Sequence, residues 1–137
     1  MIRTALLIPL LFLLACSDDG VAPVEDSEPY RLSNGEAWAM IRDNCGQEEF
    51  CLIDVRTPEE VAGGYIDCAK FMDWLGGEFE DLVDPLPRGN TYLIYCRRGN
   101  RTQEARDAMV ALGFTDVFDL RDGWNSWVDD GYPWTVD

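Results

Sequence analysis

Runs of apolar residues alternate along the chain with segments in which apolar residues recur at every third or fourth position. The runs have the length of buried strands, and the three-to-four spacing predicts helices with one buried face. Strands are expected at residues 51–55, within 65–72, at 91–95 and at 116–120. Because strands and helices alternate at short spacing, this order predicts a three-layer α/β fold, in which helices cover both faces of a mostly parallel sheet.

Residues that start and stop helices mark the helix boundaries. Ser33 and Thr57 each precede a glutamate by three positions, which is the spacing of a capping box, and a proline follows Thr57 at the first helical position. Glycines stand where three of the helices should end. Five helices are expected. The first runs from Ser33 to near Asn44, the second from Thr57 to Gly63, and the third lies around residues 79–83. The fourth begins after residue 100 and ends at Gly113, and the fifth runs from around Trp124 to Gly131.

Residues 1–15 have the character of a secretory signal. Arg3 gives a positive start, residues 5–14 form an apolar run too short to anchor in a bilayer, and an alanine precedes Cys16. The sequence Leu-Leu-Ala-Cys that ends at Cys16 resembles the lipobox of bacterial lipoproteins, although a smaller residue is more usual at its second position. This resemblance implies that Cys16 is lipidated and becomes the mature N-terminus. A plain secretory signal is the first alternative, and a cytosolic start is the second.

Residues 16–29 are acidic and show no periodicity, which predicts a flexible tether in front of a single domain at residues 30–137. The net charge of the chain is −15. Such a charge disfavours binding to nucleic acid and to anionic lipid headgroups, so membrane attachment would depend on the lipid alone. We therefore expect a lipoprotein of the cell envelope that faces the periplasm or the exterior.

The sequence Tyr-Cys-Arg-Arg-Gly-Asn-Arg at residues 95–101 lies between an expected strand and an expected helix. N–H groups without partners point outward at a helix N-terminus and stabilise an anion such as a thiolate. Arginine opposes the helix dipole in a first turn, so three arginines at this position indicate an anionic substrate. Cys96 is therefore the candidate nucleophile; the alternative is an inert core cysteine beside a solvated basic surface.

The chain contains no histidine. This composition excludes Cys–His and Ser–His nucleophile pairs and histidine-ligated metal sites. Activation of Cys96 would depend on backbone N–H groups, the helix dipole and arginine, and we expect neither a metal nor a cofactor. Arg97, Arg98, Arg101 and Arg106 fall within ten residues and predict a local positive patch that suits a small anion.

Four segments resemble the motifs of the rhodanese family of sulfurtransferases. They are Leu-Ile-Asp-Val-Arg-Thr-Pro-Glu-Glu at 52–60, Gly-Tyr-Ile-Asp-Cys-Ala at 64–69, the cysteine loop at 95–101 and the closing segment at 113–133. The match runs from about residue 33 to residue 134 with the motifs in the family's order. The resemblance implies a five-stranded parallel sheet flanked by helices.

The resemblance also implies a reaction. Cys96 would take sulfane sulfur from thiosulfate or from a persulfide donor, hold it as a persulfide, and pass it to a thiol or to cyanide. Arg97 and Arg101 are expected to hold the leaving sulfite, and Gly99 would allow the tight loop. The residues implied in substrate binding are Arg97, Arg98, Gly99, Asn100 and Arg101, and Asp54 and Arg56 resemble scaffold residues beneath the loop.

Two positions depart from the family pattern. Tyr65 replaces a usual histidine, and Cys68 replaces a usual glycine. Cys45, Cys51 and Cys68 could pair in an oxidising compartment. The strand order of the family would place the strands of Cys51 and Cys68 side by side, while Cys45 ends the preceding helix. One of the three must stay free or pair with Cys96, and we expect the disulfide to join Cys45 and Cys68. The alternative is that the three are small buried apolar residues.

Three other functions compete with sulfur transfer. Phosphatases and arsenate reductases of this fold need an arginine six positions after the cysteine, where this chain has Thr102, so both are disfavoured. A catalytically silent binding module is disfavoured because Cys96 and its loop are intact. A thiol-redox protein remains a third reading, although no Cys-x-x-Cys sequence is present.

Overall fold

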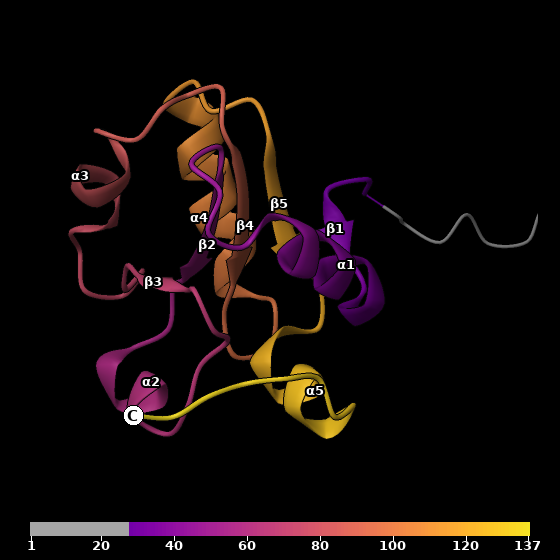
Figure 1. Cartoon of the computed structure of the whole chain (residues 1–137). Helices are drawn as coiled ribbons and strands as arrows, with labels where there is room; N and C mark the ends of the chain where they lie inside the picture. The colour runs from indigo at the N-terminus through magenta and orange to yellow at the C-terminus, as the bar shows by residue number, and fades with distance from the viewer. Residues whose placement is uncertain (1–27) are drawn as a thin grey trace, which may run out of the picture.

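The structure is a computed structural model that describes residues 28–137. The expected signal segment, Cys16 and the tether as far as residue 27 lie outside the described residues. A five-stranded sheet with the order β1-β5-β4-β2-β3 forms the centre of the molecule, and all of its strand pairs are parallel (Figure 1). The strands are β1 Arg31–Leu32, β2 Phe50–Asp54, β3 Lys70–Phe71, β4 Thr91–Tyr95 and β5 Val117–Leu120.

Helices follow the strands as the sequence predicts. Ser33 with Glu36, and Thr57 with Glu60, form complete capping boxes at the starts of the first two helices. In each box the glutamate carboxylate also accepts the N–H of the cap residue, at 2.9 Å in both cases. The helices are α1 Asn34–Asn44, α2 Pro58–Ala62, α3 Phe79–Val83, α4 Arg101–Ala111 and α5 Gly123–Asp129.

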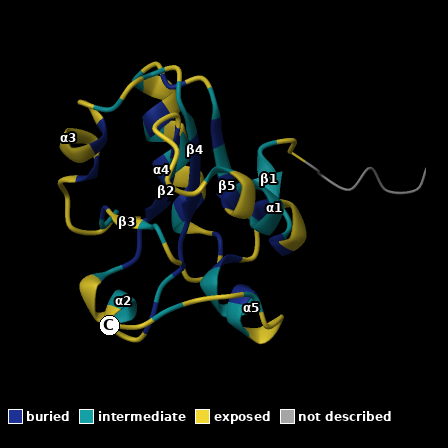
Figure 2. Cartoon of the chain, viewed as in Figure 1, coloured by how far each residue is buried: buried dark blue, intermediate teal, exposed yellow. Residues whose placement is uncertain are grey.

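Two apolar clusters, one on each face of the sheet, make up the core. Side chains alternate along each strand, so Ile53 and Ile94 face one cluster while Leu52 and Leu93 face the other. The first cluster includes residues of α3 and α4, and the second includes residues of α1 and α5. The three central strands β2, β4 and β5 are accordingly buried for most of their length, whereas the edge strand β3 is exposed, as are many residues on the outer helix faces and in the loops (Figure 2). The expected three-layer α/β fold is confirmed.

Strand β1 is the one strand that the sequence pattern does not locate. It has two residues, too few to show alternation, and it is a strand because it pairs with β5 through Arg31 opposite Asp119 and Leu32 opposite Leu120. The five-strand count implied by the family resemblance is nevertheless correct.

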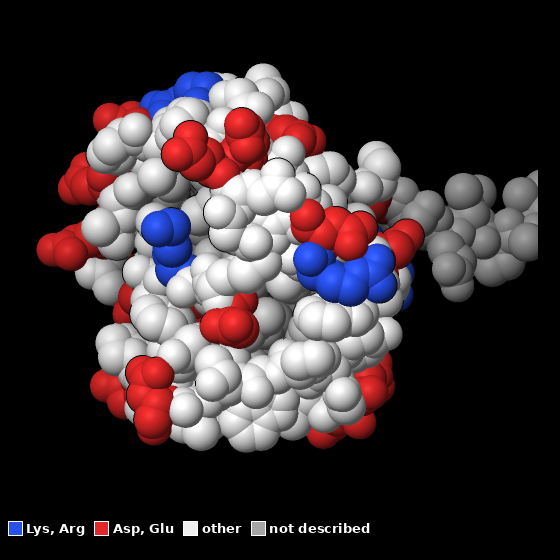
Figure 3. Space-filling model, viewed as in Figure 1, with Lys and Arg blue, Asp and Glu red and all other residues white. Residues whose placement is uncertain are grey.

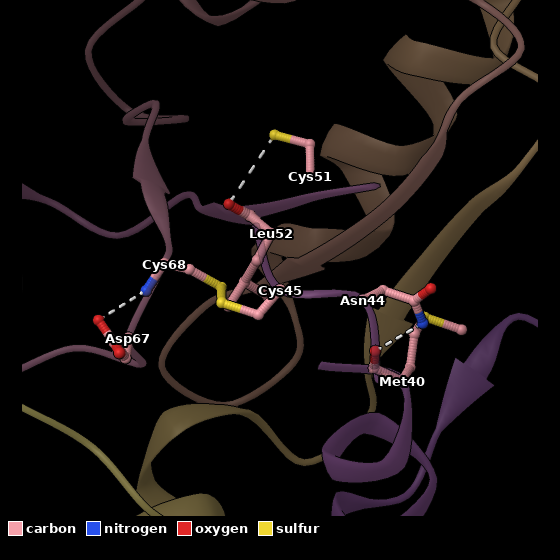
Figure 4. The surroundings of a disulfide bond; sticks show 7 residues. All are labelled: Met40, Asn44, Cys45, Cys51, Leu52, Asp67 and Cys68. Carbon is pink, nitrogen blue, oxygen red and sulfur yellow. Dashed lines mark hydrogen bonds between the residues drawn. A yellow bond between two sulfur atoms is a disulfide. The ribbon is translucent and has the colours of Figure 1, made fainter. Parts of the chain in front are cut away.

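A disulfide joins Cys45, the C-terminal cap of α1, to Cys68, two residues before β3 (Figure 4). This is the pair that the family resemblance suggests. Cys68 has a φ of 64°, in the left-handed region that glycine adopts most easily. Cys51 is free and partly buried, and it packs against the cluster on the opposite face of the sheet from Cys68.

Parallel strands end at the same edge of a sheet, and loops there form ligand sites in α/β folds. Strands β2 and β4 are neighbours in the sheet, with Asp54 opposite Tyr95 at their last residues. The short helices α2 and α5 lie at this end of the molecule (Figure 1). Among residues 28–137, the longest helices have 11 residues, and no helix has the length and apolar character needed to cross a membrane.

Candidate active site

Residues 96–100 form a tight loop between β4 and α4. Cys96 is 1% exposed, and its Sγ accepts a hydrogen bond from the N–H of Gly99 at 3.1 Å. Asn100 is the N-cap residue of α4, but its side chain makes no capping hydrogen bond. The sulfur therefore lies inside the loop, before the N-terminus of α4, where N–H groups and the helix dipole stabilise a thiolate.

Two glycines give the loop its shape. Gly99 has a φ of 87°, and a Cβ atom there would lie 1.9 Å from the carbonyl oxygen of Arg121. Gly123 has a φ of 72°, and its Cβ would lie 2.6 Å from backbone atoms of Arg97 and Arg98. The loop thus packs directly against the backbone at the end of β5 and the start of α5. A side chain at either glycine would therefore displace the loop from this backbone.

The first turn of α5 holds the loop by hydrogen bonds. Trp124 N–H donates to the carbonyl of Cys96 at 2.8 Å, and Asn125 N–H donates to the carbonyl of Arg97 at 3.1 Å. These donors are among the first N–H groups of a helix, which have no partner within the helix itself. The conformation of the Cys96 loop therefore depends on α5 as well as on the flanking β4 and α4.

A buried carboxylate supports the other end of the loop. Asp119 is fully buried in β5, and its oxygens lie 3.2–3.3 Å from Arg31 Nε and 2.7 Å from the Thr102 hydroxyl. Arg31 Nη2 also donates to the carbonyl of Gly99 at 2.9 Å, and the Thr102 hydroxyl lies 3.0 Å from the same carbonyl. Sequence reasoning missed these three supports, although an aspartate inside an apolar strand is a signal that could have found them.

Asp54 and Arg56, the two residues expected to support the loop from beneath, form a buried ion pair. Arg56 is 2% exposed, and its Nε and Nη2 donate to the carboxylate of Asp54 at 2.8–3.1 Å. Its Nη2 also donates to the carbonyl of Gly64 at 2.7 Å, and the guanidinium lies 4.3 Å from the ring centroid of Trp124. Every face of this guanidinium is occupied, which suits a structural ion pair rather than a free anion-binding group.

Arg101 is engaged in an ion pair, which changes the role expected for it. Its two terminal nitrogens lie 2.7 and 2.8 Å from the carboxylate oxygens of Glu60. The hydrogen bonds from Arg101 lower the pKa of Glu60 to about 2, and the same pairing raises the pKa of Arg101. Glu60, expected only as a helix cap, therefore occupies the guanidinium that we expected to hold sulfite.

Two of the four arginines expected to form a positive patch, Arg101 and Arg106, are engaged within the protein. Arg106 donates to the carbonyl of Val117 at 2.9 Å, and its guanidinium lies 3.3 Å from the ring centroid of Tyr30. Only Arg97 and Arg98 of the expected four are exposed without an ion pair inside residues 28–137. On the face seen in Figure 3, acidic side chains lie in scattered groups and basic side chains in a few separate groups, with other residues between them.

A cavity of about 360 Å³ opens beside the loop. Its lining comes from the loop, from the region around α2 and from α5, and it consists of Arg56, Glu59, Glu60, Arg97, Trp124 and Asn125. Tyr65, in the position where the family usually has histidine, is not part of this lining; its backbone pairs with Thr135 and its hydroxyl donates to Asp137. In residues 28–137, no three acidic or cysteine side chains are grouped to hold a metal ion.

Comparison with known proteins gives this arrangement a context. The family model for the rhodanese-like domain matches residues 33–130. A sulfurtransferase of Allochromatium vinosum is 32% identical over 87 residues, which cover 63% of this chain and 78% of that protein. The thiosulfate sulfurtransferase GlpE of Pseudomonas aeruginosa is 25% identical over 101 residues, which cover 74% of this chain and 86% of that protein.

Solved structures agree in fold. A rhodanese-related protein from Thermoplasma volcanium superposes with a TM-score of 0.67 at 24% identity, over 78% of this chain and 98% of that one. A rhodanese-like domain protein from Staphylococcus aureus superposes with a TM-score of 0.62, also at 24% identity, over 78% of this chain and 97% of that one.

Proposed function

Because the chain belongs to the rhodanese-like family, we propose that it is a sulfurtransferase in which Cys96 carries the transferred sulfur as a persulfide. The observation that carries the proposal is the position of Cys96 Sγ, 3.1 Å from the N–H of Gly99 inside the loop before α4. An N–H group that faces the sulfur can donate a hydrogen bond to the negative charge of a thiolate or of a persulfide, which are the charged forms that sulfur transfer uses.

The first half-reaction loads the cysteine. The Cys96 thiolate attacks the outer sulfur of thiosulfate, a new S–S bond forms, and the old S–S bond breaks so that its electron pair leaves with sulfite. The terminal sulfur of the persulfide then takes the place of the thiolate before the N-terminus of α4, where the same N–H donors and dipole stabilise its charge. A persulfide donor reacts in the same way, with a thiolate as the leaving group.

Arg97 and Arg98 are the cations available to an anionic donor. Both are exposed, and the loop that carries them is fixed by α5. Arg101 contributes less than the resemblance implies, because its charge is compensated by Glu60. The second half-reaction is attack by a thiol or cyanide on the outer sulfur, which restores the Cys96 thiolate.

A location in the cell envelope belongs to the same proposal. Its support is the lipobox-like sequence that ends at Cys16, the acidic residues that follow it, and the Cys45–Cys68 disulfide, a bond typical of oxidising compartments. The test is labelling of cells with a radioactive fatty acid. Label on the parent protein and its absence from a Cys16→Ala variant are expected, whereas label on neither protein contradicts lipidation.

Intact mass spectrometry tests the chemistry. The purified protein should gain the mass of one sulfur atom after incubation with thiosulfate and lose it on addition of cyanide, while a Cys96→Ser variant should gain nothing. A parent protein that gains no sulfur from thiosulfate, polysulfide or a small persulfide would contradict sulfur transfer. A silent binding module would then be favoured, and a Cys96 disulfide found by peptide mapping would instead favour a thiol-redox role.

A further inference from the structure

The cavity beside the loop contains two opposite charges that have no partner. Glu59, on α2, and Arg97, on the loop, are both exposed, and neither forms an ion pair with another described residue. Asn125 adds a side-chain amide with no hydrogen-bond partner among residues 28–137. These three groups offer an acceptor for a cation, a donor for an anion and a neutral amide around one small space.

The other charges in the lining are compensated within the protein. Arg56 is paired with Asp54, and Glu60 is paired with Arg101. A ligand therefore meets one free carboxylate and one free guanidinium, with the ring of Trp124 as an apolar wall. A ligand with a single charge would pair with only one of these two groups. The other group would stay unpaired or would face a ligand charge of its own sign.

We propose that this cavity binds a zwitterionic amino thiol of the size of cysteine as the sulfur acceptor, a proposal that rests on the sulfurtransferase function above. The carboxylate of the acceptor lies at Arg97 and Asn125, and its ammonium group lies at Glu59. The volume of about 360 Å³ suits a small molecule of this kind. Arg97 follows Cys96 directly in the chain, so the cavity that holds the acceptor lies beside the loop that carries Cys96.

The transfer needs no further reagent. The thiolate of the acceptor attacks the outer sulfur of the Cys96 persulfide, and an S–S bond forms between these two atoms. The bond between Cys96 Sγ and the outer sulfur breaks, and its electron pair stays on Sγ as the restored thiolate. The proton of the acceptor thiol goes to solvent, and the product is the persulfide of the amino thiol.

The acidic surface of the protein supports this class of acceptor. The net charge of −15 repels acceptors with several negative charges, and Glu59 adds a local repulsion at the cavity. With its thiol protonated, the zwitterion has no net charge, so it binds without this repulsion and still forms both ion pairs; the thiol loses its proton at the attack.

Three thiols allow the proposed contacts with Arg97 and with Glu59 to be tested separately. Cysteine carries both charges, cysteamine carries only the ammonium group, and 3-mercaptopropionate carries only the carboxylate. Protein is first loaded with sulfur, the load is verified by intact mass, and the single-turnover rate of sulfur loss is followed for each thiol. Each thiol is compared with itself across variants, so differences in intrinsic reactivity cancel.

The variants Glu59→Gln and Arg97→Gln should give crossed results. Glu59→Gln should lower the second-order rate constant of sulfur loss to cysteine and to cysteamine by about fivefold, the factor supplied by one exposed ion pair, and should not lower it for 3-mercaptopropionate. Arg97→Gln should lower it by about as much for cysteine and 3-mercaptopropionate, but not for cysteamine. Glu80→Gln, which removes an exposed carboxylate on α3 outside this cavity, is the matched control and should change none of the rates.

The outcomes distinguish the two proposals. If the parent protein cannot be loaded, the sulfurtransferase function itself fails. If it loads and transfers sulfur but the two variants slow all three thiols equally, or slow none, then the acceptor is not recognised as a zwitterion and this inference is overturned.

Discussion

Arg101 and Glu60 form a two-point ion pair, in which Nη1 lies 2.7 Å from Oε2 and Nη2 lies 2.8 Å from Oε1. The pair connects the first residue of α4 to the first turn of α2, across 41 positions of the sequence. It therefore fixes the position of α2 relative to the Cys96 loop, and it withholds one cation from any anionic donor.

The substitution Glu60→Gln tests whether the ion pair with Glu60 keeps Arg101 from binding an anionic donor. Glutamine can still cap Thr57, so the change removes mainly the ion pair. We expect the free energy of unfolding to fall by about 1 kcal/mol and the KM for thiosulfate to fall by up to about fivefold, because Arg101 becomes free to attract the anion. Urea unfolding and steady-state kinetics measure the two effects.

Glu36→Gln is the control, since Glu36 forms the other capping box and has no ion pair within residues 28–137. It should leave the KM for thiosulfate unchanged. A rise in that KM for Glu60→Gln would show that Arg101 binds the donor only while it is held by Glu60.

The same ion pair predicts a pH dependence of stability. The pKa of Glu60 is lowered from 4.5 to about 2 in the folded protein. A lowered carboxyl pKa stabilises the fold above the unfolded-state pKa, and this stabilisation is lost as the pH falls from about 5 toward 2. The difference in unfolding free energy between the parent and Glu60→Gln should therefore shrink between pH 6 and pH 3. A difference that stays constant over this range would contradict the pairing.

Gly99→Ala should destroy the loop. The added methyl group would collide with the carbonyl of Arg121 at 1.9 Å, and the φ of 87° is strained for alanine. We expect a loss of at least about 2 kcal/mol in unfolding free energy and loss of sulfur loading by intact mass. Gly89→Ala is the control, because a Cβ at Gly89 meets no atom within 4 Å. Normal loading by Gly99→Ala would mean that the loop tolerates a different backbone.

Arg56→Lys should destabilise the protein although it keeps the charge. Lysine cannot reproduce the forked hydrogen bonds to Asp54 together with the bond to Gly64, so the buried carboxylate loses partners. A loss of about 3 kcal/mol is expected in urea unfolding. The exposed Arg121→Lys should change stability by less than about 0.5 kcal/mol. Equal effects of the two substitutions would refute a structural role for Arg56.

Removal of the disulfide should lower stability without removing activity. Cys45 and Cys68 are separated by 23 positions, and closing a loop of this length contributes about 3 kcal/mol by the chain-entropy account. The double variant Cys45→Ala/Cys68→Ala should unfold at correspondingly lower urea concentration and still load sulfur on Cys96. If loading were lost from the folded double variant, the disulfide would have a role in the chemistry.

Local signals in the sequence were sufficient to predict the helices and the position of Cys96 between a strand and a helix. Ser33 and Thr57 predict where α1 and α2 begin because a capping box is complete within four residues. Cys96 stands out because strand, cysteine, glycine and arginines are adjacent in the chain. The patterns failed where a residue's partner is distant: the Glu60 carboxylate already has a local role as a cap, so nothing nearby indicates its ion pair with Arg101.

The same reason explains the supports of the loop. Asp119, Thr102 and Arg31 come from β5, α4 and β1, and only the sheet order brings them together around Gly99. Arg106 likewise looked free because its partners, Val117 and Tyr30, lie in other elements. Geometry between elements, rather than residue type, decides which arginines remain available.

The hydrogen bonds from Trp124 and Asn125 to the loop have a consequence for biosynthesis. The carbonyls of Cys96 and Arg97 receive these donors only after α5, which follows the loop in the chain, has been made and has docked. A nascent chain that already contains the cysteine still lacks two contacts that shape its loop. The loop around this sulfur therefore acquires its final geometry only after residues 123–129 have been synthesised and have docked.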